Sequence, residues 1–168
     1  RGPGLLFILP YFTVLLHTIP LMAGSAPVAS IHAALPLMEQ FYTIQGEGFY
    51  QGHAAYFIRL GGCEVGCVWC DVKESWDASA HPLWHVDAII EKVKATGGKI
   101  AVVTGGEPAM YDLSQLTKTL RDSGIRTHIE TSGVYPLTGT WDWICFSPKK
   151  FTSPDPSIFK LANEVKII

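Results

Sequence analysis

The chain has 168 residues, enough for one domain with a hydrophobic core. Hydrophobic residues make up 48% and charged residues 17%, which excludes an intrinsically disordered chain. The formal net charge is −2 and there is no basic block, so binding to nucleic-acid phosphates has no support. Four cysteines are too few for a disulfide scaffold. Three of them lie within eight positions, which favours a metal site.

The first 38 residues carry no charged side chain except Arg1, and 5–16 is almost wholly apolar. Three interpretations compete for this segment. A secretory signal would end at the small residues 23–26. A membrane anchor would need roughly 20 apolar residues. The third interpretation is a read-through or leader outside the fold. We favour the third, because the chemistry inferred below needs a reducing compartment. We expect residues 1–36 to lie outside the fold and 37–168 to form one domain.

The rest of the chain predicts alternating strands and helices. In chain order these are a strand at 54–60, a helix at 83–95, a strand at 100–103, a helix at 112–123, and strands at 125–131 and 143–146. Asp112 and Gln115 match a capping box at the start of the second helix. The alternation favours an α/β fold with parallel strands and right-handed crossovers. Residues 164–168 alternate like a strand cut off at its end, so we expect a missing C-terminal portion.

The strongest chemical signal is a cysteine loop directly after the 54–60 strand. Cys63, Cys67 and Cys70 have the spacing C-x3-C-x2-C. Thiolates are the usual ligands of iron–sulfur clusters, and three of them leave one iron of a four-iron cube open to another ligand. The alternative is a structural zinc site, which needs four ligands. The loop offers three, and Cys145 is the one cysteine left over.

This spacing, with an aromatic residue before the last cysteine, resembles the signature of radical S-adenosylmethionine (SAM) enzymes. The resemblance implies a [4Fe–4S] cluster on Cys63, Cys67 and Cys70, with SAM chelated to the open iron and cleaved to a 5′-deoxyadenosyl radical. It implies that Trp69 lies beside the SAM adenine. It also implies a modified, incomplete (β/α) barrel with a parallel sheet, truncated here at the C-terminus.

Three further motifs follow predicted strands. Parallel α/β folds place their sites at this end of strands. Thr104-Gly-Gly-Glu-Pro108 resembles the motif that holds the SAM amino group in these enzymes. In the same enzymes, segments such as 130–133 and 147–149 face SAM and substrate. The resemblance thus assigns SAM binding to Trp69, Gly105, Gly106, Glu107, Glu130, Ser147, Pro148 and Lys149.

The run Phe41-Tyr-Thr-Ile-Gln-Gly-Glu-Gly48, together with Arg59 and the motifs downstream, narrows the resemblance. Residues 37–168 are similar to the 7-carboxy-7-deazaguanine synthases of queuosine and deazapurine biosynthesis. This implies a carbon–nitrogen lyase that acts on 6-carboxy-5,6,7,8-tetrahydropterin by hydrogen abstraction at C6, ring contraction and loss of ammonia. A flat pterin needs fixed donors and acceptors, and an arginine fork suits its carboxylate. Substrate binding is assigned to Ile44, Gln45, Gly46, Glu47, Arg59 and Thr104.

The same resemblance implies Mg²⁺ at the substrate carboxylate. The threonine that commonly binds this ion is replaced by Val72. This leaves Asp71 or water as the ligand, or a weaker dependence on Mg²⁺. The cluster and SAM carry the radical chemistry, so no catalytic side chain is assigned.

The resemblance further implies a flavodoxin- or ferredoxin-like electron donor, a homodimer and a cytoplasmic location. It implies no direct contact with nucleic acid or membrane. Two other functions stay open at this point. One is a radical SAM activase that acts on a partner protein, and the other is a zinc-stapled binding module without catalysis.

Overall fold

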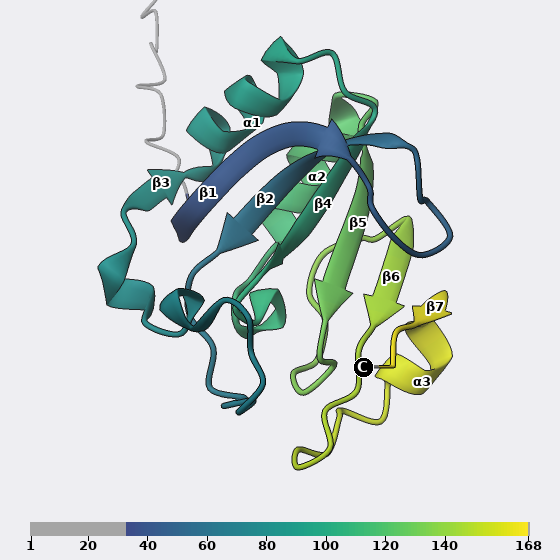
Figure 1. Ribbon diagram of the computed structural model, residues 1–168. Helices are drawn as coiled ribbons and strands as arrows, with labels where there is room; N and C mark the ends of the chain where they lie inside the picture. Colours follow the sequence, from purple (N-terminus) through teal and green to yellow (C-terminus); the bar gives the residue numbers. More distant parts are fainter. Residues whose placement is uncertain (1–32, 168) are drawn as a thin grey trace, which may run out of the picture. The chain divides into compact units, whose positions relative to one another are not determined.

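The computed structural model describes residues 33–167, and its strands and helices alternate along the chain (Figure 1). The strands are β1 (Ala34–Ile44), β2 (Ala54–Leu60), β3 (Leu83–His85), β4 (Ile100–Gly105), β5 (Arg126–Thr131), β6 (Trp143–Phe146) and β7 (Glu164–Val165). The α-helices are α1 (Val86–Ala95), α2 (Ser114–Asp122) and α3 (Ile158–Leu161). Short 3-10 helices span Lys73–Ser75, Ala78–Ala80 and Pro108–Met110. In this part of the chain no helix is long and apolar enough to cross a membrane.

The seven strands form one sheet in the order β3-β1-β2-β4-β5-β6-β7. Strand β2 and the four strands that follow it in this order run parallel to one another. Strand β1 runs antiparallel to both β2 and β3. The predicted α/β fold with a parallel sheet is therefore confirmed, with an antiparallel edge added to it.

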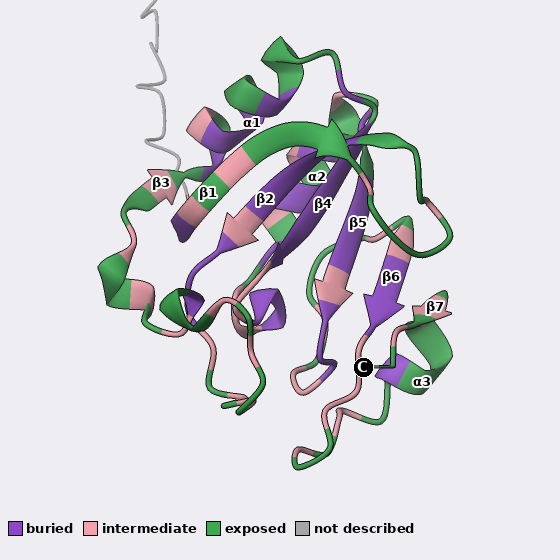
Figure 2. Ribbon diagram, in the orientation of Figure 1, coloured by how far each residue is buried: buried purple, intermediate pink, exposed green. Residues whose placement is uncertain are grey.

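One face of the sheet packs against α1 and α2 and forms the core (Figures 1 and 2). Each helix turns an apolar stripe toward the sheet, and Ile89 on α1 and Leu116 on α2 are fully buried. The strands contribute every second residue, as a pleated strand must. Ile58 on β2, Val103 on β4 and Ile129 on β5 belong to this core.

The opposite face of the sheet carries the alternate residues and is much more polar. Phe57 on β2 and Val102 on β4 belong to a small second apolar cluster. Beyond them, toward the carboxyl ends of the strands, this face presents Arg59, Thr104 and Glu130. The two-residue period thus separates a packed face from a face that lines cavities.

Local signals misplace two helix starts. The predicted helix at 83–95 begins only at Val86, because 83–85 form β3 and pair with 34–36 of β1. The expected capping box does not close at α2. Asp112 accepts from the Ser114 N–H (2.9 Å), whereas the Gln115 side chain accepts from the Ala33 N–H (3.2 Å).

Strand β1 is absent from the sequence prediction, which placed the first strand at 54–60. The new strand begins at Ala34, three residues before the expected domain start at residue 37. Residues 1–32 of the expected N-terminal segment lie outside the part of the chain that the structure describes. The predicted strand at 164–168 corresponds to the two residues of β7, and residue 168 lies outside the described range.

The core predicts the cost of truncating a helix residue. We expect Leu116→Ala to lower the free energy of unfolding by about 2–5 kcal/mol, because it removes a fully buried side chain from the helix–sheet contact. Chemical denaturation measures this loss. Lys118→Ala, on the exposed side of the same helix, should change stability by less than about 0.5 kcal/mol. Equal effects of both changes would contradict the assigned packing of α2.

Candidate active site

A cavity of about 470 Å³ lies at the carboxyl ends of β2, β4, β5 and β6. Its size falls in the range of small-molecule sites. It brings together most of the residues singled out in the sequence, which come from segments far apart in the chain. These are Gln45, Glu47, Arg59, Cys63, Cys67, Trp69, Cys70, Asp71, Thr104, Gly105, Gly106, Glu107, Glu130, Ser147 and Lys149.

The cysteine loop leaves β2 and forms one wall of this cavity. Its entrance is held by two backbone bonds, from the Gly62 N–H to Ser75 O (2.6 Å) and from the Cys63 N–H to Trp76 O (3.1 Å). Tyr135 on the far side donates to the carboxylate of Glu64 in the loop (3.0 Å). These three bonds fix the start of the loop at residues 62–64.

All three loop cysteines are free thiols of intermediate burial that line the same cavity. Burial raises the pKa of the Cys63 thiol. In a [4Fe–4S] cluster each thiolate binds its own iron, so three thiols on the lining of one cavity suit such a cluster.

The glycine motif after β4 packs directly against the start of the cysteine loop. The Gly106 N–H donates to Leu60 O (2.9 Å) and the Glu107 N–H donates to Gly62 O (2.8 Å). Gly105 has φ +126°, and a Cβ there would clash with the backbone of Leu60. Only glycine allows the two segments to approach this closely.

Glu107 is the most deeply buried acid of the site, at 1% exposure. Its Oε1 accepts from the Ala109 N–H (3.0 Å) and the Thr131 hydroxyl (2.6 Å). Its Oε2 accepts from the Ser132 N–H (2.8 Å) and from the Ser132 hydroxyl. The carboxylate is thus engaged by four donors of the protein itself and ties the end of β4 to the end of β5.

Glu130 lines the cavity and joins two predicted groups of residues. Gln45 Nε2 donates to its Oε1 (3.0 Å), and the Thr104 hydroxyl donates to its Oε2 (3.3 Å). Gln45 and Thr104 were assigned to the substrate, whereas Glu130 was assigned to SAM. The structure places all three in one hydrogen-bonded group.

Two further charged residues of the cavity are paired. Arg59 Nε donates to Glu39 Oε1 (2.7 Å), and Glu47 forms an ion pair with Lys166. Burial alone lowers the pKa of Lys166, but the hydrogen bond and charge of Glu47 outweigh it, so the pKa is raised. At the end of β6, Lys149 Nζ donates to the Ser147 hydroxyl (2.8 Å).

Three residues assigned from the sequence do not line the main cavity. Ile44 is 62% exposed and pairs with Ala54 inside the sheet. The Gly46 N–H donates to the side chain of the neighbouring Gln45 (2.9 Å). Pro148 borders a separate hollow of about 730 Å³, together with Trp69, Lys149, Lys150 and Ile167.

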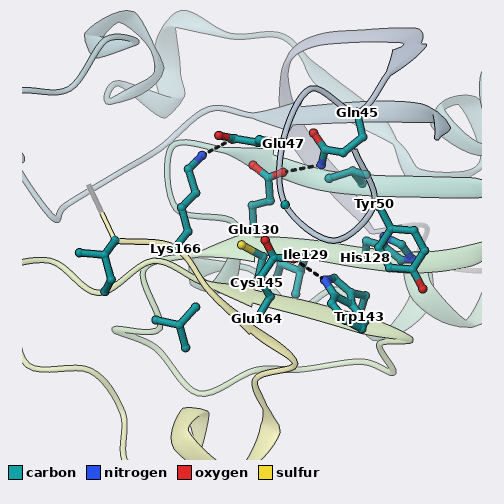
Figure 3. Close-up of a pocket in the computed structure, with 14 residues that line it drawn as sticks. Gln45, Glu47, Tyr50, His128, Ile129, Glu130, Trp143, Cys145, Glu164 and Lys166 are labelled. Atoms are coloured by element: carbon teal, nitrogen blue, oxygen red, sulfur yellow. Dashed lines mark hydrogen bonds and ion pairs between the residues drawn. The ribbon is translucent and has the colours of Figure 1, made fainter. Parts of the chain in front are cut away.

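A second cavity of about 280 Å³ adjoins the first on the same face of the sheet (Figure 3). The two share Gln45, Glu47, Glu130, Cys145 and Lys166. Four residues of this smaller cavity were not predicted as site residues, namely Tyr50, Trp143, Glu164 and Lys166. The strand predicted at 164–168 would put Glu164 and Lys166 on one face, but it does not indicate what they contact, and Lys166 lies just after β7.

Comparison with known proteins agrees with this geometry. The family model of the radical SAM superfamily matches residues 57–145, more than half of the chain. The 7-carboxy-7-deazaguanine synthase of Flavobacterium psychrophilum is 56% identical over 134 residues, which cover 80% of this chain and 63% of that protein. The protein of the same name from Synechocystis is 50% identical over 133 residues, covering 79% and 64%.

A solved structure is also similar. The crystal structure of QueE from Escherichia coli matches with a TM-score of 0.73 and 33% identity, covering 80% of this chain and 70% of that one. The chain belongs to the radical SAM superfamily, whose members use a [4Fe–4S] cluster and SAM. Within it, the chain belongs to the family of the 7-carboxy-7-deazaguanine synthases. It spans 63–64% of the length of the first two relatives.

The burial of Glu107 yields a stability prediction. Glu107→Ala should lower the free energy of unfolding by about 2–4 kcal/mol, because donors of Ser132 and Thr131 lose their acceptor inside the protein. Denaturant unfolding measures the loss. Glu64→Ala, which removes an exposed acid of the cysteine loop, is the matched control and should cost less than about 1 kcal/mol.

A second prediction concerns pH. His128 is 4% exposed and packs on Tyr50 at 4.5 Å between ring centroids. Burial, and then the charge of Arg126, lower its pKa from 6.5 to about 4, against the opposing charge of Asp142. The His128 imidazole is therefore protonated below about pH 6.5 in the unfolded state, but only below about pH 4 in the folded state.

The contribution of His128 to the free energy of unfolding should therefore be at its maximum above pH 6.5. Protonation of this residue alone should lower the free energy of unfolding by about 2 kcal/mol between pH 7.5 and 5. Urea unfolding of the wild type and of His128→Gln over this range isolates the contribution. The variant should lose this part of the pH dependence. If the free energy of unfolding depends on pH in the same way in the variant and in the wild type, the imidazole is not held neutral in the folded protein.

Proposed function

We propose that this protein converts 6-carboxy-5,6,7,8-tetrahydropterin to 7-carboxy-7-deazaguanine and ammonia. The product equals the substrate less one ammonia, so the hydrogen atom removed at C6 is returned within the same turnover. The observation that carries the proposal is the single cavity shared by the cysteine loop and the Gln45–Glu130–Thr104 group. When bound, the cluster and SAM supply the radical that removes this hydrogen.

The residues around the cluster position suit a cofactor and a small ligand side by side. Cys63, Cys67 and Cys70 hold the cluster in this proposal. Residues at the ends of β4, β5 and β6 would hold SAM, among them the backbone groups of Gly105 and Gly106. Because the Glu107 carboxylate is already engaged by four donors, its contribution is to fix those backbone groups rather than to bind SAM with its side chain.

The substrate lies against the opposite wall. Glu130 accepts hydrogen bonds from ring N–H groups of the pterin. Gln45 and Thr104 donate to the Glu130 carboxylate and hold it in place. Arg59, with one nitrogen on Glu39, offers its remaining N–H groups to the substrate carboxylate. Glu47 and Lys166 place a charge of each sign at the rim.

The Mg²⁺ ion belongs to this proposal as well. Asp71 and Val72 both line the cavity, and of the two only Asp71 has a side-chain oxygen. Asp71 or water would hold the ion, which would stabilise the negative charge of the substrate carboxylate. The family resemblance supports the ion and also supports a flavodoxin- or ferredoxin-like electron donor and a homodimer. Four unpaired cysteines support a reducing, cytoplasmic location.

An anaerobic reaction tests the proposal. The chain is reconstituted with iron and sulfide and supplied with dithionite, SAM, Mg²⁺ and the carboxypterin, and mass spectrometry follows the products. We expect 7-carboxy-7-deazaguanine, and we expect Cys67→Ala to abolish both this product and the bound iron. Cys145→Ala is the matched control, because Cys145 lies on β6 outside the loop, and it should retain its iron.

Two outcomes would contradict the proposal at different levels. Formation of 5′-deoxyadenosine without deazaguanine would preserve the cluster chemistry and refute the substrate. Zinc without iron in the purified protein would refute the cluster itself.

A further inference from the structure

The loop between β1 and β2, residues 45–53, carries Gln45 and Glu47 and lies over the cavity face of the sheet. We propose that Glu164, on β7, is a positioning residue that holds this loop in its ligand-binding conformation. The inference rests on the proposed function only where it names the pterin as the ligand.

Glu164 contacts the loop directly. Its Oε2 accepts from the Phe49 N–H (3.3 Å) and also from the Trp143 indole N–H (3.0 Å). The Phe49 ring stacks on the same indole, with 4.9 Å between ring centroids. One carboxylate oxygen therefore joins the loop backbone to β6 while the two rings pack beside it. Figure 3 shows the bond between Glu164 and Trp143.

Gly48 lies against the same carboxylate. Gly48 has φ +73°, a left-handed conformation that glycine adopts without strain. A Cβ at this position would clash with the Glu164 carboxylate. The carboxylate thus occupies the space that a side chain at residue 48 would need, and the loop backbone approaches β7 closely.

A second contact comes from the same strand end. Lys166, two residues after Glu164, forms the ion pair with Glu47. The loop is therefore attached at Glu47 and at Phe49, on both sides of Gly48. Gln45, which donates to Glu130, lies two residues before Glu47.

This attachment has a consequence for binding. If the loop adopts its ligand-binding conformation only part of the time, the apparent affinity for the ligand falls by that fraction. Loss of Glu164 should therefore weaken substrate binding and leave SAM binding unchanged, because the SAM residues lie at the ends of β4, β5 and β6. A general loss of structure would weaken both.

The test combines three readouts on the reconstituted protein. They are hydrogen exchange of the amides of 45–53, KM and kcat with the carboxypterin, and the Kd for SAM. We expect Glu164→Ala to speed exchange in the loop and to raise KM, each by about 10-fold, with kcat and the SAM Kd within about 3-fold of wild type. Glu164→Gln keeps an acceptor oxygen, so both the exchange rate of the loop and KM should return most of the way to the wild-type values.

Two further variants sharpen the result. Trp143→Phe removes the indole donor but keeps an aromatic ring beside Phe49, so we expect a smaller rise in both exchange and KM. Glu91→Ala removes an exposed acid from α1 and serves as the matched control, which should leave every readout unchanged.

Each outcome bears on the inference. Unchanged exchange in Glu164→Ala would overturn it, and so would a raised KM without faster exchange, which would make Glu164 a direct ligand of the substrate. Equal losses of substrate and SAM binding would make its role merely structural, which also overturns it. If the wild type makes no product from the carboxypterin, the proposed function fails, while the exchange data still decide whether Glu164 holds the loop.

Discussion

Parallel strand direction is the constraint on which this site depends. Because β2, β4, β5 and β6 run the same way, the segments that follow them emerge at one edge of the sheet. Segments that are far apart in the sequence therefore become neighbours: the cysteine loop, the Gly105–Glu107 turn, and the ends of β5 and β6. Buried hydrogen bonds then fix these neighbours at short range. The carboxylate of Glu107 is the most protected of them, since it ties β4 to β5 from inside the protein.

In the proposed function two ligands share the site, whose central side chains form one hydrogen-bonded group. Glu130 receives bonds from Gln45, on the loop after β1, and from Thr104, at the end of β4. A ligand that displaces either bond therefore changes the environment of the other donor. The same carboxylate borders both cavities, so the smaller cavity is an extension of the larger one rather than an independent site.

The sequence predicts the parallel part of this fold well, because its signals are local. The strands at 54–60 and 143–146 have the predicted bounds. The antiparallel edge escapes prediction for a physical reason. Much of β1 is exposed, including Phe41 and Ile44, so it lacks the apolar alternation of a half-buried strand. The strand at 83–85 depends on pairing with β1, which no local pattern reveals.

The same distinction holds for the candidate site. Motifs next to strand ends, such as Thr104–Glu107 and Cys63–Cys70, are recognisable by their spacing, and the structure brings them to one cavity. Residues that act through distant pairing did not. Glu164 and Lys166 reach the loop only through the folded sheet, and nothing near them in the chain indicates a partner more than a hundred residues away.

The loop across the sheet also has a consequence for how the protein is made. Glu164 reaches Phe49 over a separation of 115 residues, and Lys166 reaches Glu47 over 119. Contacts of such high sequence separation form late, because the entropy of closing a long chain must be overcome first. On the ribosome, the cysteine loop emerges well before β7 exists. The three thiols are therefore synthesised ahead of β7, and a newly made chain passes through a stage in which the cysteine loop exists but the contacts of Glu164 and Lys166 with the 45–53 loop do not.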